Sequence, residues 1–193
     1  MKALHFVILF FFASHSKGQL ATPDFSSSAT KRDSLKNQEL FKLTSGYDFA
    51  ISHRMSCHWF KHKKYEILCY KNGKWSQFTL LTDIQNKKKE IQEGKIKIIK
   101  HKANQVLCDS VWSFLIRDSL FTMNNDSLNV YEKGLIYKAI DDGVFYEFII
   151  RTNSKMRVIN SYEPDEYYKW LPFIDERKYF INCRDKFQTL WKH

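Results

Sequence analysis

Residues 65–80, YEILCYKNGKWSQFTL, decide the fold class of this chain. Two runs that carry apolar residues flank Asn72-Gly73, and an Asn-Gly pair tolerates the positive φ angles of a two-residue β-hairpin turn. The register predicted by this turn sets apolar residues opposite one another in three pairs: Tyr70 and Trp75, Ile67 and Phe78, Tyr65 and Leu80. The apolar pattern and the turn chemistry therefore agree on antiparallel strands.

A further strand is expected immediately before this hairpin. Apolar residues recur there at every second position, which is the period of a strand: Phe49, Ile51, Met55, Cys57 and Trp59. We expect this strand to turn back about Lys63, which sets Cys57 directly opposite Cys69. Direct cross-strand neighbours lie about 4.5–5.5 Å apart, within disulfide range.

The remaining sequence alternates between strand and helix signals. The strand signals cover residues 95–101, where lysines face outward from an edge strand, and residues 135–140, 144–150 and 156–162, with a turn at Asp141-Asp142-Gly143. The helix signals cover residues 82–93, 104–121, 163–171 and 175–191.

This order predicts an α+β protein with antiparallel hairpins and two main helices packed on one face, in the order βββ-α-βββ-α. We expect a single domain over residues 34–193, preceded by a flexible arm over residues 19–33 that is rich in Ser, Thr and Ala.

Residues 1–18 have the pattern of a secretory signal peptide. Lys2 supplies a short positive region, residues 4–13 (LHFVILFFFA) are apolar, and Ser16 and Gly18 are small residues at the positions that a signal peptidase recognises. The apolar run is about half the 20 residues that a membrane-spanning helix needs. We therefore expect a secreted or periplasmic protein with no transmembrane segment in its mature chain.

An even number of cysteines in an exported chain favours disulfides. The chain has four, Cys57, Cys69, Cys108 and Cys183. Besides Cys57–Cys69, we expect a Cys108–Cys183 bond, because each of these lies on the apolar side of an expected helix. The alternative is that Cys108 and Cys183 are buried free thiols, which pack as small apolar side chains.

A basic stretch is the first candidate binding surface in a chain of net charge +10. Its members are lysines: Lys87, Lys88, Lys89, Lys95, Lys97, Lys100 and Lys102. Such a stretch can bind an anionic polymer or surface. The alternative is a solvated face in which lysines protect an edge strand from aggregation.

Two further clusters invite a functional interpretation. An aromatic segment, Tyr162, Tyr167, Tyr168 and Trp170, is a candidate ligand platform, although such a segment is more often the buried face of a helix. Three histidines, His53, His58 and His62, are a weak candidate metal site. Residues four apart on a strand are separated by about 13 Å, so His58 and His62 share an ion only if the chain turns sharply between them.

Short modification patterns also occur. Four Asp-Ser-apolar tripeptides, beginning at Asp33, Asp109, Asp118 and Asp126, resemble the acceptor consensus of a bacterial protein O-glycosylation system that acts on exported proteins. Asn125 begins the N-glycosylation sequon Asn-Asp-Ser, which matters only in a eukaryotic host.

Sequence motifs for nucleotide binding and catalysis are absent from this chain. Six glycines cannot build a Gly-rich phosphate loop, and the G-x-S-x-G, H-E-x-x-H and C-x-x-C patterns do not occur. We expect no cofactor and predict an exported domain that binds a ligand or partner outside the cytoplasm. A secreted enzyme of hydrolase type, without a recognisable motif, is the alternative.

Overall fold

A computed structural model of the chain describes residues 20, 23–28, 37–60, 62–83, 96–130, 132–133, 136–137 and 140–192. The expected signal peptide, residues 1–18, lies outside the described residues, as does most of the expected helix over residues 82–93. Residues 82 and 83 themselves belong to a strand instead.

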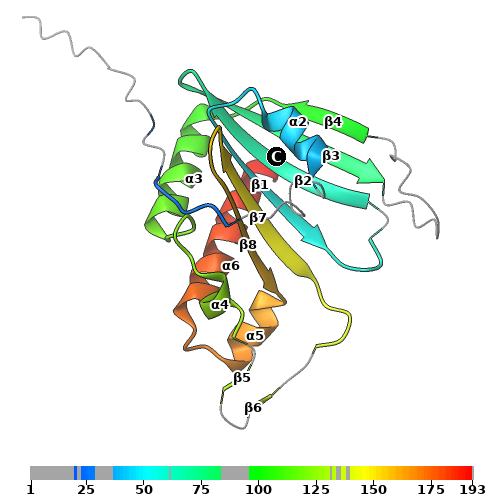
Figure 1. The fold of residues 1–193 in the computed structure, drawn as a ribbon, viewed down its shortest axis with the longest axis vertical. Helices are drawn as coiled ribbons and strands as arrows, with labels where there is room; N and C mark the ends of the chain where they lie inside the picture. Colours follow the sequence, from blue (N-terminus) through cyan, green and yellow to red (C-terminus); the bar gives the residue numbers. More distant parts are fainter. Residues whose placement is uncertain are drawn as a thin grey trace, which may run out of the picture.

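Six strands form one antiparallel sheet, in the order β4-β3-β2-β1-β7-β8 (Figure 1). Their bounds are β1 Phe49–Ser56, β2 His62–Lys71, β3 Lys74–Asp83, β4 Ile96–His101, β7 Phe145–Thr152 and β8 Met156–Tyr162. Two short strands, β5 Glu132–Lys133 and β6 Ile136–Tyr137, pair only with each other. The first half of the chain thus supplies four strands of the main sheet, among them the edge strand expected over residues 95–101, and the second half supplies two.

Helices cover both faces of this sheet (Figure 1). One face carries α3 Gln105–Arg117, α4 Asn125–Leu128, α5 Pro164–Trp170, α6 Asp175–Gln188 and the 3-10 turn Thr189–Trp191. The other face carries the short helix α2, Gln38–Thr44. The α+β class is confirmed, and the two long helices α3 and α6 lie on the same face and contact each other.

The β2–β3 hairpin has the predicted register. Its turn residues both adopt positive φ, 49° at Asn72 and 76° at Gly73. All three predicted cross-strand pairs are present: Tyr70 with Trp75, Ile67 with Phe78 and Tyr65 with Leu80. A turn that only a few residue types can adopt therefore determines the pairing over both ten-residue strands.

The expected register of β1 and β2 is wrong. Cys69 lies opposite Ala50, and Cys57 follows the end of β1. The chain reverses around residues 57–60 instead of at Lys63. The expected and the observed partner of Cys69, Cys57 and Ala50, are an odd number of residues apart. The side chains of β1 that were expected on the same sheet face as Cys69 therefore lie on the opposite face.

The expected disulfides are therefore also wrong, and all four cysteines are free thiols. Cys69 is buried between the sheet and α2, whereas Cys108 and Cys183 are buried among the long helices on the other face. For Cys108 and Cys183 the structure agrees with the alternative, in which they pack as small apolar side chains.

Two apolar cores sandwich the sheet. The larger core joins the sheet to α3, α4 and α6 through fully buried side chains such as Phe49, Phe148 and Phe180. The smaller core lies under α2 and contains Leu40, Ile67 and further residues. Each fully buried side chain of this size contributes about 1.5–3 kcal/mol, so the larger core supplies most of the apolar stabilisation.

The N-terminal segment 23–28 is docked on the sheet, although it belongs to the expected flexible arm. Phe25 is buried in the larger core. The Ser28 N–H donates to the Met156 carbonyl at 3.0 Å, which places the segment along the outer side of β8.

Side-chain amides cover the rest of that edge of the sheet. Asn125 donates to the Val158 carbonyl at 3.0 Å and accepts from the Asn160 N–H at 3.2 Å, while Asn129 donates to the Asn160 carbonyl at 2.8 Å. These bonds satisfy backbone groups that an edge strand otherwise leaves to water. They also engage the amide of the Asn125 sequon in the fold.

Candidate functional site

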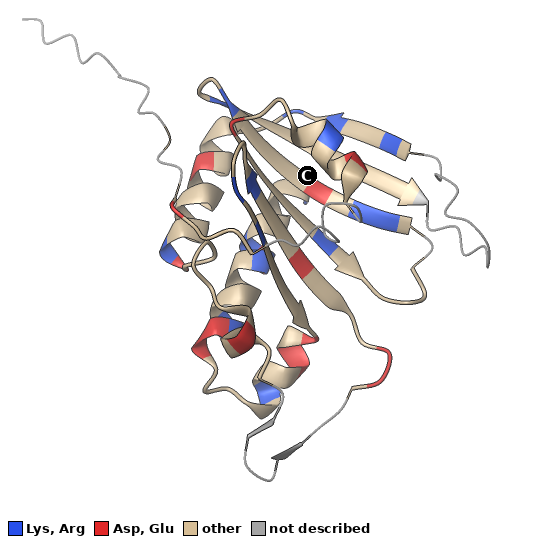
Figure 2. Cartoon of the chain, in the orientation of Figure 1, with Lys and Arg blue, Asp and Glu red and all other residues tan. Residues whose placement is uncertain are grey.

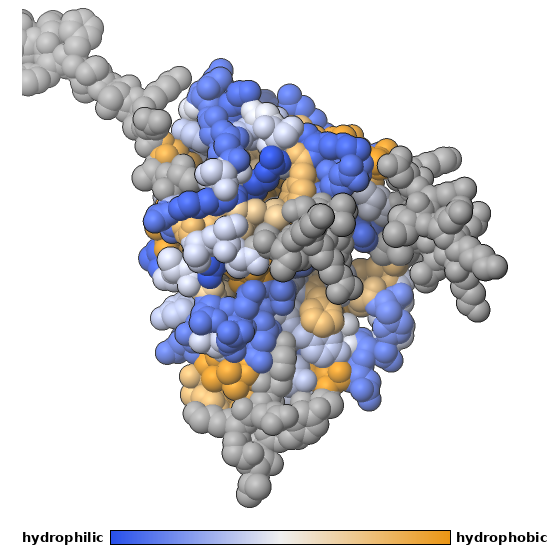
Figure 3. Space-filling view, in the orientation of Figure 1, coloured by the Kyte–Doolittle hydropathy of each residue, from blue (hydrophilic) through white to orange (hydrophobic). Residues whose placement is uncertain are grey.

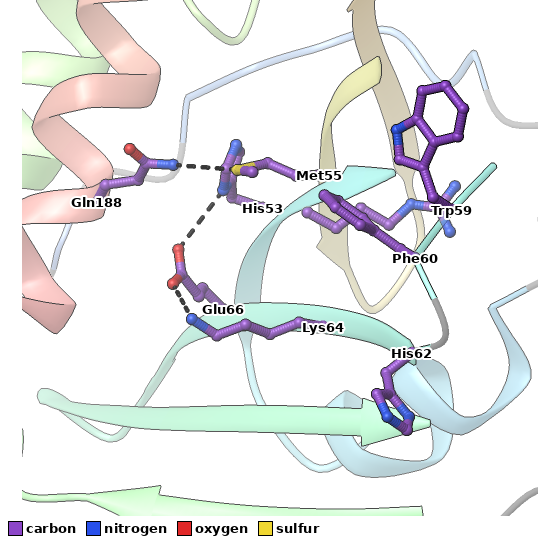
Figure 4. Close-up of a pocket in the computed structure, with 9 residues that line it drawn as sticks. His53, Met55, Trp59, Phe60, His62, Lys64, Glu66 and Gln188 are labelled. Atoms are coloured by element: carbon purple, nitrogen blue, oxygen red, sulfur yellow. Dashed lines mark hydrogen bonds and ion pairs between the residues drawn. The ribbon is translucent and has the colours of Figure 1, made fainter. Parts of the chain in front are cut away.

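A cavity of about 390 Å³ lies where the sheet meets the C-terminal end of α6 (Figure 4). Small-molecule sites range from about 300 to 1,000 Å³, so this cavity is large enough for a compact ligand. Its walls come from β1, β2, the loop between them and α6, through nine residues: His53, Arg54, Met55, Trp59, Phe60, His62, Lys64, Glu66 and Gln188.

The strand register explains why polar groups lie on the floor of this cavity. His53 is directly opposite Glu66, and Met55 is directly opposite Lys64. These positions continue the rows that place apolar side chains of β1 and β2 in the larger core, because side chains two apart share a face. The polar residues therefore occupy core-facing positions at the end of the two strands.

His53 and Glu66 form a buried pair. His53 is only 2% exposed, and its Nδ1 lies 3.6 Å from Glu66 Oε2. Lys64 donates to the other carboxylate oxygen, Oε1, at 2.8 Å. Figure 4 shows the carboxylate of Glu66 between the imidazole of His53 and the amine of Lys64.

The pKa values of this pair follow from burial and charge. Burial lowers the pKa of His53 below its ordinary value and outweighs the attraction of Glu66. Burial alone would raise the pKa of Glu66, but His53 and Lys64 outweigh burial and hold that pKa below its ordinary value. At neutral pH the floor therefore carries a neutral imidazole and an ionised carboxylate that is paired with Lys64.

The far side of the imidazole is packed in apolar surroundings. The ring centroid of His53 lies 5.0 Å from that of Phe148 and 6.2 Å from that of Phe187. Its Nε2 atom is buried and has no hydrogen-bond partner among the described residues. Of the two ring nitrogens, only Nδ1 therefore has an ion-pair partner among the described residues.

Two exposed aromatic side chains border the cavity from the β1–β2 loop. Trp59 is 56% exposed and Phe60 is 37% exposed. They lie on the other side of the cavity from Gln188, whose amide donates to Met55 Sδ at 3.9 Å (Figure 4). Neighbouring exposed aromatic rings at the mouth of a cavity are typical of a binding site, because large apolar surface is otherwise buried.

The loop that carries these rings is held at two points. The Phe60 N–H donates to the Cys57 carbonyl at 3.3 Å, which closes a tight turn. His58 Nε2 lies 3.3 Å from a carboxylate oxygen of Asp142 in the loop before β7. Arg54, which also borders the cavity, is ion-paired with Glu147 at 2.8 Å.

The three histidines of the expected metal site are separated by this arrangement. His53 and His62 line the cavity, whereas His58 lies beside Asp142 and packs, with a tilted ring, against Trp59. Within the described ranges, no group of three His, Cys, Asp or Glu side chains is placed to hold a metal ion.

The described part of the basic stretch lies on and beside the edge strand β4. Lys97, Lys100 and Lys102 are exposed, and Lys97 and Lys100 lie on opposite faces because they are three residues apart on a strand. Figure 2 shows basic positions of β4 in blue. Ile96 and Ile98 are exposed beside them, so apolar and hydrophilic surface alternate over β4 (Figure 3). Lys87, Lys88, Lys89 and Lys95 lie outside the described residues.

The aromatic segment is part of the packing around α5. Tyr167 is buried, and Tyr162, Tyr168 and Trp170 are half-buried. The hydroxyl of Tyr162 accepts from the Gly143 N–H and donates to the Ile140 carbonyl, both at 2.7 Å. These contacts favour the interpretation of the segment as a buried helix face over an open platform.

A second hollow, of about 460 Å³, lies between segment 23–28 and α4. Arg157 lines this hollow. Its guanidinium group already donates to Ser26 Oγ at 2.8 Å and to the Met123 carbonyl at 2.5 Å. The first cavity is the stronger candidate, since it combines exposed aromatic rings with a buried polar pair.

The sequence interpretation named His53 and His62, as weak candidate metal ligands, and did not name the other residues around the cavity. Glu66 offered a signal, because it precedes Leu68 by two positions in a strand and therefore faces the core side. An acidic residue in a core-facing position indicates a partner or a site.

Comparison with known proteins gives no match: no family model, no curated protein and no solved structure is similar to the chain. Across the described residues, no helix combines the length and the apolar character that crossing a membrane requires.

Proposed function

We propose that this chain is a small-molecule-binding protein and that its ligand occupies the cavity between β1, β2 and α6. One observation carries the proposal: Trp59 and Phe60 are exposed at a cavity of about 390 Å³ whose floor is the buried pair His53 and Glu66. Sites for small molecules combine apolar and aromatic walls with a few fixed polar groups in this way.

The charges around the cavity favour an uncharged ligand. Lys64 and Glu66 pair with each other, Arg54 pairs with Glu147, and burial keeps His53 neutral at neutral pH. A charged ligand would have to compete with one of these pairs, whereas an uncharged ring stacks on the aromatic side chains without that cost.

The cellular location is part of the same proposal. The apolar run of residues 4–13, followed by Ser16 and Gly18, supports export and action outside the cytoplasm. A protein that binds a small molecule there would capture or carry it and would not need the nucleotide motifs that the sequence lacks.

An enzyme is the alternative, and the His53–Glu66 pair is the observation that favours it. An imidazole oriented by a carboxylate resembles a general base. However, His53 is only 2% exposed and its ring packs against Phe148 and Phe187, which leaves little of the imidazole open to a substrate. Binding is therefore the better-supported function.

Binding is tested by ligand-observed NMR titration of the full chain with two uncharged probes, 2-naphthol and 2-methoxynaphthalene. We expect Phe60→Ala and Trp59→Ala to weaken binding of both probes at least tenfold, because each removes an aromatic wall. Phe173→Ala is the matched control, since Phe173 is 50% exposed on the turn between α5 and α6. Equal affinities in the Phe60→Ala variant and the unaltered chain would contradict the proposal.

A further inference from the structure

The Glu66 carboxylate has acceptor capacity that the described residues do not use. A carboxylate offers about four lone-pair positions. In the described chain Glu66 accepts one hydrogen bond, from Lys64 to Oε1. Its Oε2 is buried at the floor, lies 3.6 Å from His53 Nδ1, beyond hydrogen-bond length, and has no hydrogen-bond partner within the described residues. The group borders the cavity and is 9% exposed.

We infer that the ligand of this cavity carries a hydroxyl group and donates a hydrogen bond from it to Glu66, so that the ligand class is an uncharged aromatic alcohol. The inference rests on the proposed function, because it assigns the ligand chemistry of the same cavity. The aromatic part stacks on Trp59 and Phe60, and the hydroxyl group reaches the floor.

Other headgroups fit the floor less well. An anionic group would meet the ionised carboxylate of Glu66, whose positive partner Lys64 is already engaged. A cationic group would approach Lys64 and Arg54. A ligand that only accepts hydrogen bonds leaves the carboxylate unsatisfied, whereas a hydroxyl donor forms the charge-assisted bond that a carboxylate favours.

His53 acts here as a positioning residue. Its ring packs beside the carboxylate, with Nδ1 3.6 Å from Oε2 of Glu66, while Lys64 donates to Oε1. The two side chains fix the plane of the carboxylate before any ligand binds. A carboxylate that is already fixed loses less conformational entropy when a ligand binds. It therefore discriminates more sharply between ligands that carry a hydrogen-bond donor and those that do not.

The test compares the two probes, since 2-methoxynaphthalene keeps the oxygen of 2-naphthol but lacks its O–H donor. We expect the unaltered chain to bind 2-naphthol at least tenfold more tightly than 2-methoxynaphthalene. Glu66→Gln should reduce this preference to about threefold or less, because a neutral acceptor makes a weaker bond. Glu39→Gln is the matched control, since it makes the same change on α2, outside the cavity lining, and should keep the preference. Thermal melting of each variant confirms that it is folded.

The outcomes separate the two proposals. Equal binding of both probes by the unaltered chain, or a preference that Glu66→Gln leaves unchanged, would overturn the inference and leave small-molecule binding in place. Failure of the unaltered chain to bind either probe would contradict the proposed function and the inference together.

Discussion

His53 and Glu66 face each other across β1 and β2, with 3.6 Å between Nδ1 and Oε2, at the point where the core-facing rows of both strands reach the cavity. A buried pair of this kind links the charge state of the site to the stability of the fold. It also makes the role of each partner measurable by single substitutions.

Stability should depend on the protonation of His53. Burial lowers the pKa of His53 below 6.5 in the folded chain, so the unfolded chain binds more protons as the pH falls below about 6.5. The free energy of unfolding should then decrease by up to about 1.4 kcal/mol per pH unit until the folded-state pKa is passed. The groups that set this pKa are Glu66, Lys64 and Arg184. Urea unfolding between pH 7.5 and 5 measures the slope.

The variant His53→Gln should flatten that slope, because glutamine does not titrate. Gln188→Ala is the control, since it removes a side chain that does not titrate from the same cavity and should leave the slope unchanged. An unaltered slope in His53→Gln would show that another group titrates.

The four cysteines should all react as thiols. Burial raises the pKa of Cys69 and Cys108 to about 12 and also raises the pKa of Cys183, whereas Cys57 is only half-buried. Because the thiolate is the reactive form, titration with Ellman's reagent should find four thiols in guanidinium and about one fast-reacting thiol in the native chain. Fewer than four in denaturant would restore the disulfide interpretation.

The hairpin turn offers a test of backbone conformation. Gly73 has a φ of +76°, and an added Cβ would meet no atom within 4 Å, so any cost of Gly73→Ala is conformational. We expect a loss of about 1–2 kcal/mol in the free energy of unfolding. Gly46→Ala is the control, because Gly46 also has open space around it but no positive φ, and it should be neutral or slightly stabilising.

Removing only one partner of the ion pair between Arg54 and Glu147 should lower the free energy of unfolding. Both residues are buried, and Arg54 also donates to the Tyr65 hydroxyl at 3.2 Å. Arg54→Met should destabilise the fold by about 3–5 kcal/mol, because it leaves a buried carboxylate unpaired. The double variant Arg54→Met/Glu147→Leu should recover much of that loss in thermal or urea unfolding. A double variant that is no more stable than Arg54→Met would contradict this account.

Local turn chemistry determined how much of the fold could be predicted. Asn72-Gly73 admits one kind of turn, so the register of β2 and β3 followed from the sequence and is confirmed. The β1–β2 loop contains no such pair, and strand alternation is the same wherever the chain reverses. The reversal was therefore placed at Lys63, and both the Cys57–Cys69 pairing and the face of β1 were wrong.

The candidate site was hidden for the same reason. With the correct register, His53 meets Glu66 across the strands, and Trp59 and Phe60 lie in the loop instead of in a strand. Each of these residues was visible in the sequence, but the cavity exists only through their pairing and through Gln188, which arrives from the far end of the chain.

The side-chain caps on β8 also set a limit on how copies of this molecule can join. A sheet with two open edges can add a copy at each edge, and a row of copies built in this way has no natural end. Here Ser28, Asn125 and Asn129 already bond to the outer side of β8. The chain's own groups thus occupy the outer side of β8, and β4, at the other end of the strand order, is the edge at which a strand of a second copy could add.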